Sequence, residues 1–134
     1  MIALDTNVLI YACDKADPRR QQIALDLVSN TADAVILWQV ACEFIAASRK
    51  LERQGFTAAE AWARLSEFLA VCPLVTPSGH SVLDRAKNLH LAQQVSFWDA
   101  MILSACLDAG VDLLLSEDVP GGEVSGVRVV NPFG

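Results

Sequence analysis

Residues 1–12 of the chain are MIALDTNVLIYA, an apolar segment interrupted by the polar residues Asp5, Thr6 and Asn7. The first five residues, MIALD, are typical of a short buried strand that ends at Asp5. Asp5 has two interpretations at this point. It forms a turn by bonding to nearby backbone, or it is a carboxylate placed at the edge of a buried strand. The remainder of the sequence is needed to decide between them.

Strands and helices are expected to alternate along most of the chain. Apolar runs bounded by turn residues predict strands at 1–5, 34–38, 72–77, 113–115 and 127–130. Capping residues, prolines and glycines predict helices from Pro18 onward and at 39–53, 57–71, 78–94 and 96–110. The segment EDVPGGEVSG, between the last two strands, is expected to be a loop. This order predicts one three-layer α/β/α domain over residues 1–134, with a mainly parallel central sheet.

The composition points to an intracellular chain with a partly covered surface. Apolar residues make up 53% of the 134 residues and the mean hydropathy is +0.35, so we expect a partner chain or a second copy to cover some of the surface. Four scattered cysteines form no C-x-x-C pair. Three of them lie in apolar patterns, so buried free thiols in a reducing cytoplasm are expected. Neither a signal peptide nor an apolar run of about 18 residues is found, which predicts a cytoplasmic protein.

The chain is acidic, with a formal net charge of −6 and a pI of about 4.7. Nucleic-acid binding driven by counterion release needs a basic surface, so this charge alone argues against it. Acidic side chains gathered at one point can nevertheless bind a divalent cation, which then supplies positive charge. The class of function therefore depends on where the acidic residues lie.

Four acidic positions fall where a parallel α/β sheet collects functional groups, at the carboxyl ends of strands and the helix starts that follow. Asp5 ends the first strand, and Glu43 lies in the first turns of the helix after the second strand. Asp99 lies in the first turn of its helix, and Asp118 follows the strand LLL, with Glu117 beside it. The other acids are expected in caps, turns, polar helix faces or strand starts.

Each of the four positions also has an ordinary explanation. Asp5 and Asp118 are suited to turns. Glu43 could be a surface residue at the edge of an apolar stripe, and Asp99 could belong to a capping box opened by Ser96. Taken together, however, four converging carboxylates would repel one another unless a cation neutralised them. Their oxygens favour Mg²⁺ or Mn²⁺ over zinc, and such an ion is suited to phosphodiester hydrolysis.

Several segments occur in an order and at spacings that match one known family. They are LDTNVLIYA near the N-terminus, QVACEF around Glu43, FWDAMI around Asp99, and LLLSED followed by VVNPF. In these segments, which span essentially the whole chain, the sequence resembles PIN domains, and specifically the VapC-type toxins of bacterial toxin–antitoxin pairs. The resemblance implies a Mg²⁺-dependent endoribonuclease, with Mn²⁺ as a substitute.

The resemblance also implies which acids form the catalytic and metal-binding site. Asp5 and Asp99 match the primary metal ligands, and Glu43 and Asp118 would complete the site directly or through water. A one-residue shift would replace Asp118 by Glu117, and the S-E-D pattern favours Asp118. Under this resemblance, Asp5 is a metal-binding carboxylate at a strand end rather than a turn-former.

Further expectations follow from the same resemblance. Three polar residues match positions that orient the carboxylates or the attacking water: Thr6, Asn7 and Ser116. The implied partners are an RNA substrate, a second copy of the chain in a homodimer, and a cognate antitoxin whose C-terminal segment occupies the cleft. Three basic residues beyond Glu43 on its predicted helix could contact RNA phosphates or form a solvated helix face: Arg49, Lys50 and Arg53.

Two other functions remain open on the sequence alone. One is a non-catalytic binding scaffold whose acids serve only as caps. The other, less favoured, is an aspartyl phosphatase of the haloacid dehalogenase type with Asp5 as nucleophile, which expects a second acid where this chain has Asn7. On the predicted helical hairpin, Trp62 and Phe68 could be core residues or part of a partner surface.

Overall fold

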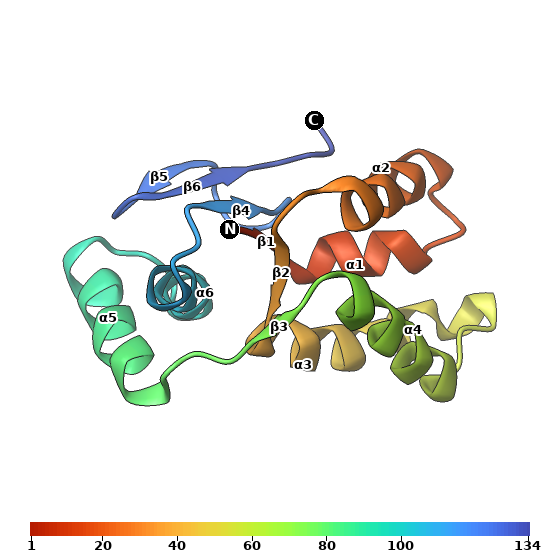
Figure 1. The fold of residues 1–134 in the computed structure, drawn as a ribbon, viewed down its shortest axis with the longest axis horizontal. Coiled ribbons are helices and arrows are strands. Elements are labelled where there is room, and N and C mark those ends of the chain that lie inside the picture. Colours follow the sequence, from red (N-terminus) through yellow and green to blue (C-terminus); the bar gives the residue numbers. More distant parts are fainter.

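The centre of the structure is a sheet of six short strands in the order β3-β2-β1-β4-β6-β5 (Figure 1). The computed structural model describes residues 1–134. The strands are β1 (Ile2–Leu4), β2 (Ala34–Leu37), β3 (Leu74–Val75), β4 (Leu113–Leu115), β5 (Gly122–Val124) and β6 (Val127–Val130). All neighbouring strands pair in parallel except β5 and β6, which are antiparallel. The prediction of a mainly parallel sheet is confirmed.

Six α-helices surround this sheet. They are α1 (Thr6–Cys13), α2 (Pro18–Asn30), α3 (Trp38–Ala47), α4 (Ala58–Val71), α5 (Gly79–Ala92) and α6 (Phe97–Ala109). A 3₁₀ segment, η1 (Ser48–Gln54), joins α3 to α4. The pair α5 and α6 lies to one side of the strands, and α1 to α4 lie to the other (Figure 1). The predicted three-layer α/β/α class is confirmed. No helix combines the length and the apolar composition needed to cross a bilayer.

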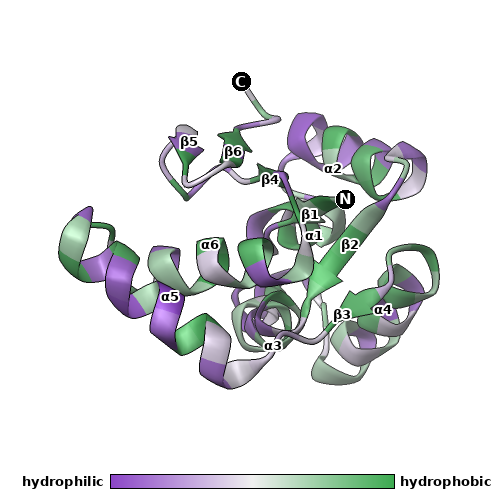
Figure 2. Cartoon of the chain, turned by 60° about the vertical axis from the view of Figure 1, so that its left-hand side comes forward, coloured by the Kyte–Doolittle hydropathy of each residue, from purple (hydrophilic) through white to green (hydrophobic).

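The core lies between the sheet and its helical layers. All four residues of β2 are buried, as expected for a parallel strand covered on both faces. The strand is apolar along its length (Figure 2). Phe44 of α3 is completely buried and meets Phe68 of α4 edge to face, with ring centroids 5.6 Å apart. Phe68 is therefore a core residue, whereas Trp62 on the same helix is exposed. Three cysteines are buried free thiols, as expected, and the fourth, Cys42, is exposed.

Two elements were not expected from the sequence. Helix α1 begins directly after Asp5, where no helix was predicted, and most of its residues are buried, so its sequence lacks an amphipathic period. The segment expected to be a loop before the last strand contains β5, which forms a hairpin with β6. Ser125 and Gly126 both have positive φ, the backbone of a two-residue type I′ turn.

One predicted helix is correct in place but differs in form. Residues 39–53 were expected to be one α-helix, and the structure has α3 followed by η1, which ends at Gly55 in the left-handed conformation. Because a 3₁₀ turn has three residues instead of 3.6, the basic side chains of η1 point in directions that the α-helical spacing did not predict. Ser96 occupies the N-cap of α6, yet its side chain makes no capping hydrogen bond.

Candidate functional site

Asp5 lies between β1 and β4 at the carboxyl edge of the sheet. Its backbone N–H donates to the carbonyl of Leu115 at 3.0 Å, which ties the end of β1 to β4. Asp5 is also the N-cap of α1, and its Oδ1 accepts a hydrogen bond from the N–H of Thr6 at 2.7 Å. The residue is only 6% exposed. Asp5 therefore caps a helix and is at the same time a buried carboxylate at a strand end.

Ser116 connects Asp5 to the segment after β4. Its hydroxyl donates to Oδ2 of Asp5 at 2.6 Å and accepts from the N–H groups of Asp118 at 3.1 Å and Val119 at 3.0 Å. The side chain is fully buried. Serine is suited to this position because one small hydroxyl can accept from a turn and donate to a carboxylate.

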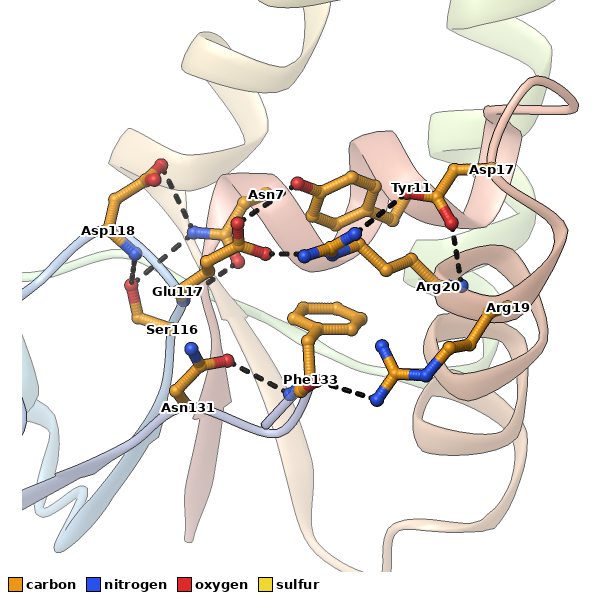
Figure 3. A network of polar contacts seen from close by, with 10 residues as sticks. All are labelled: Asn7, Tyr11, Asp17, Arg19, Arg20, Ser116, Glu117, Asp118, Asn131 and Phe133. Atoms are coloured by element: carbon orange, nitrogen blue, oxygen red, sulfur yellow. Dashed lines mark hydrogen bonds and ion pairs between the residues drawn. The ribbon is translucent and has the colours of Figure 1, made fainter.

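Asn7 contacts two of the predicted acids. Its Nδ2 lies 3.4 Å from Oδ2 of Asp5. The same Nδ2 lies 3.3 Å from Oδ2 of Asp118, and the Oδ1 of Asn7 accepts from the N–H of Glu117 at 3.1 Å (Figure 3). A carboxylate in place of Asn7 would add negative charge and remove this donor. The amide therefore holds Asp5 and Asp118 near each other without adding to their repulsion.

Glu43 is oriented by two side chains. Its Oε2 accepts from the hydroxyl of Thr6 at 2.9 Å, and its Oε1 accepts from Nε2 of Gln39 at 3.0 Å. Thr6 is in the first turn of α1, and Gln39 precedes Glu43 by one turn of α3. Gln39 was not singled out in the sequence, although its i, i+4 spacing from Glu43 is a detectable signal.

All four predicted acids line one small cavity of about 120 Å³. The lining consists of Asp5, Thr6, Gln39, Glu43, Trp98, Asp99, Ile102, Asp118 and Val119. We call this the acid cavity. Asp99 reaches it from the first turn of α6, and no hydrogen bond occupies its carboxylate. The capping-box explanation of Asp99 therefore has no support in the contacts of Ser96.

The acid cavity disfavours the ionised form of Asp5. Burial raises the pKa of this carboxyl above its usual value, and the nearby charges of Glu43 and Asp118 add to the increase. The hydrogen bonds from Ser116 and from the N–H of Thr6 act in the opposite direction without cancelling the effect of burial. A cation bound beside Asp5 would favour the ionised carboxylate and lower this pKa.

This raised pKa predicts how stability depends on pH. A carboxyl whose pKa is higher in the folded state stabilises that state below the unfolded pKa, and this contribution is lost as pH rises through the folded pKa. Without metal, we expect the free energy of unfolding of the wild type, minus that of Asp5→Asn, to decrease from pH 4 to pH 7.5. Urea unfolding of both proteins in EDTA measures this difference, in which titrating groups that do not interact with Asp5 cancel. A difference that stays constant or increases with pH would contradict the expectation.

The structure does not contain a preformed cluster of three or more His, Cys, Asp or Glu side chains arranged to hold a metal ion. The donor chemistry of the acid cavity nevertheless fits a hard divalent cation, because its ionisable ligands are all carboxylates. The charges of Glu43 and Asp118 lie close enough to Asp5 to add to the rise in its pKa that burial causes. The residues therefore fit Mg²⁺ or Mn²⁺ in type, and their side chains would have to move to bring three of them onto one ion.

Glu117 points away from the acid cavity. Its Oε1 accepts from the hydroxyl of Tyr11 at 3.1 Å, and its Oε2 lies 3.5 Å from Nε of Arg20, which also bonds Asp17 at 3.0 Å (Figure 3). Glu117 thereby joins the segment after β4 to α1 and α2. Of the two adjacent acids, Asp118 lines the cavity and Glu117 does not. Sequence reasoning did not identify Tyr11 and Arg20 as partners of this segment.

The three basic candidates lie in η1 and differ in their surroundings. Lys50 lines a larger hollow of about 820 Å³ together with Thr6, Asn7, Glu43 and Asp118. The guanidinium of Arg49 donates to the carbonyl of Phe56 at 3.0 Å and so stabilises the turn into α4. Arg53 is exposed outside this hollow. Lys50 is thus the basic residue adjoining the acids.

Comparisons with known proteins agree with this architecture. The family model of the PIN domain matches residues 2–119. No curated protein matches the sequence significantly. Among solved structures, VapC20 of Mycobacterium tuberculosis, described as a toxin that cleaves the sarcin–ricin loop, has a TM-score of 0.66 at 18% identity, covering 88% of this chain and 90% of that one. A toxin–antitoxin complex from Klebsiella pneumoniae has a TM-score of 0.64 at 20% identity, covering 98% of each chain. PAE2754 of Pyrobaculum aerophilum has a TM-score of 0.59 at 19% identity, covering 87% of this chain and 78% of that one.

Proposed function

Because the chain belongs to the PIN domain family, we propose that it is a metal-dependent endoribonuclease and the toxin of a type II toxin–antitoxin pair. The observation that carries the proposal is the convergence of Asp5, Glu43, Asp99 and Asp118 on one cavity. The toxin role is supported by similarly folded proteins described as a toxin and as a toxin–antitoxin complex.

Asp5 and Asp99 would hold Mg²⁺ or Mn²⁺, and Glu43 and Asp118 would complete the site. When bound, such an ion polarises the phosphoryl oxygen and lowers the pKa of a bound water. Asp5 is suited to a ligand role because its position is fixed by the helix cap and by Ser116. Asp99 is suited because its carboxylate accepts no hydrogen bond from the protein.

The remaining polar residues would position these acids. Thr6 donates to Oε2 of Glu43, and Gln39 donates to Oε1. The two hydrogen bonds hold the carboxylate in one orientation and leave each oxygen a further lone pair for a ligand. Asn7 and Ser116 set the relative positions of Asp5 and Asp118. Outer contacts of this kind orient the residues that bind a metal or substrate, and their loss commonly lowers activity by about 10- to 100-fold.

The chemistry we propose is attack by water on an RNA phosphodiester, which leaves a 5′-phosphate and a free 3′-hydroxyl. The alternative, attack by the 2′-hydroxyl, usually depends on a general base such as histidine. His80 and His90 are both exposed on α5, and neither lines the acid cavity. An acid-centred hydrolysis is therefore the better fit to the residues around the cavity.

We further propose that the protein acts in the cytoplasm as a homodimer and is inhibited by an antitoxin that enters the cleft. Exposed large apolar residues on α5, Leu83 and Leu91, support the expectation of a covered surface. The phosphatase alternative is weakened because Asn7 replaces the second acid and both oxygens of Asp5 already accept hydrogen bonds. A non-catalytic scaffold is the remaining alternative, and the following experiment separates it from the nuclease.

Removal of metal is expected to abolish RNA cleavage. Purified protein, freed of any bound antitoxin, is incubated with labelled structured and unstructured RNAs in Mg²⁺ or Mn²⁺, with and without EDTA. We expect cleavage with either ion, none in EDTA, and recovery when excess ion is restored. If several RNAs remain intact and calorimetry detects no binding of either ion, the nuclease proposal fails and the scaffold is the better description.

A further inference from the structure

Two exposed tryptophans flank the acid cavity. Trp98, which precedes Asp99 in α6, is 65% exposed and itself lines the cavity. Trp38, the first residue of α3, is 54% exposed. The indole of Trp98 packs edge to face on Phe97, with ring centroids 4.8 Å apart, which supports one side of it. The proposed hydrolysis assigns no role to these large aromatic faces.

The two indoles border a hollow of about 420 Å³ beside the acid cavity. Its lining consists of Trp38, Gln39, Cys42, Glu43, Ala46 and Trp98, and we call it the aromatic hollow. Three of these residues, Gln39, Glu43 and Trp98, also line the acid cavity. The two spaces are therefore adjacent, and a chain with one phosphate in the acid cavity would place its neighbouring nucleotide near the aromatic hollow.

The charge of the protein favours a non-ionic contact at this place. The net charge is −6, and Lys50 is the basic residue adjoining the acids, so counterion release can supply only part of the affinity for RNA. Stacking of bases on aromatic side chains is independent of phosphate charge and tolerates many sequences. Aromatic faces next to the acid cavity would therefore provide affinity that the acids cannot.

Gln39 offers a polar contact in the same hollow. Its Nε2 is used by Glu43, and no hydrogen bond within the protein uses its side-chain oxygen. That oxygen can accept from an exocyclic amino group or a ring N–H of a base. Recognition of unpaired RNA commonly combines stacking with hydrogen bonds to base edges.

We propose that the aromatic hollow binds an unpaired RNA base next to the cleaved phosphate, with Trp98 as the stacking surface, Trp38 as the opposite wall and Gln39 as the acceptor for the base edge. The inference rests on the proposed nuclease function and assigns to three named residues the contact with the base beside the cleaved phosphate. The inference assigns the aromatic hollow to RNA and not to a partner protein.

The kinetic test compares Trp98→Ala with Trp62→Ala, since Trp62 on α4 is similarly exposed and lines neither space. On an unstructured RNA oligonucleotide with one cleavage site, we expect Trp98→Ala to raise KM by about tenfold, as loss of one base stack implies. The kcat of Trp98→Ala should change less than its KM. We expect Trp98→Phe to retain most of the affinity for the oligonucleotide and Trp62→Ala to match the wild type. An oligonucleotide that is abasic beside the cleaved phosphate should remove the difference between the wild type and Trp98→Ala.

A second readout does not depend on cleavage. Cys42 lies in the aromatic hollow and is the exposed cysteine, so its alkylation rate, followed by intact mass, reports whether the hollow is covered. With Ca²⁺ in place of Mg²⁺, saturating oligonucleotide should slow alkylation in the wild type and in Trp62→Ala, and much less in Trp98→Ala. The rate without RNA should not depend on protein concentration.

The outcomes separate the two proposals. If the wild type cleaves RNA but Trp98→Ala has an unchanged KM and Cys42 stays reactive with RNA present, the base-binding inference fails alone. If Cys42 becomes protected as protein concentration rises without RNA, the hollow is covered by a second copy and the inference is overturned. If the wild type neither cleaves nor binds any RNA, the proposed function and the inference fail together.

Discussion

Asp5→Asn is expected to lower RNA cleavage roughly a thousandfold, because a catalytic metal is worth several kcal/mol and about 1.4 kcal/mol corresponds to tenfold in rate. Asparagine keeps the shape of the side chain and can still accept from the N–H of Thr6, so the cap of α1 survives. It removes the charge that would hold the cation. The measurement is initial rates on one labelled RNA at saturating Mg²⁺, with circular dichroism to confirm the fold.

The matched control for this experiment is Asp33→Asn. Asp33 is exposed immediately before β2, at the opposite edge of the sheet from Asp5, and its positive φ is one that asparagine tolerates. Both variants change the net charge equally. We expect Asp33→Asn to cleave like the wild type. Equal activity of Asp5→Asn and wild type would remove Asp5 from the site, and equal losses in both variants would point to a general effect of charge.

The second large loss of RNA cleavage is expected when Asp118, but not the adjacent Glu117, is replaced by its amide. Asp118→Asn should lower cleavage by about 10- to 100-fold, because Asp118 lines the acid cavity and would contact the ion or its water. Glu117→Gln should cleave nearly normally and lose about 1 kcal/mol of stability, because its ion pair with Arg20 is weakened while glutamine can still accept from Tyr11. The measurements are cleavage rates and urea unfolding of both variants.

These two variants provide controls for each other, since both remove one negative charge within two neighbouring residues. The reverse result, with activity lost in Glu117→Gln and retained in Asp118→Asn, would mean that Glu117 is the fourth acid and that the segment after β4 rotates when metal binds. If both variants lose cleavage activity and neither loses stability, both acids contribute to the site.

The sheet and its carboxyl edge could be predicted because their signals are local. The buried strand at 34–37 is a continuous apolar run, and Asp17-Pro18, Thr57 and Gly110 are capping signals that the structure contains at the expected helix ends. The general rule that parallel sheets collect functional groups at strand ends then selected Asp5, Glu43, Asp99 and the adjacent pair Glu117 and Asp118. The family resemblance favoured Asp118 of that pair, and this residue lines one cavity with the other three.

The features that were missed depend on contacts between residues distant in sequence, or on helices buried on several sides, whose apolar residues show no helical period. Helix α1 is buried on several sides, so its apolar residues do not repeat every 3.6 positions. Tyr11 contacts Glu117 across 106 residues, and no local pattern indicates that pairing. The hairpin of β5 and β6 depends on Ser125 adopting a positive φ, which serine rarely does.

The two edge strands limit how another protein can bind this one. β3 has two residues and β5 has three, and these are the outermost strands of the sheet. An incoming strand would gain too few backbone hydrogen bonds at either edge to bind by extending the sheet. An inhibitory protein is therefore expected to bind this chain through side chains, on its helices and in its hollows, so the specificity of such a pair would be encoded in surface residues. The same short edges also protect the free protein from edge-to-edge aggregation.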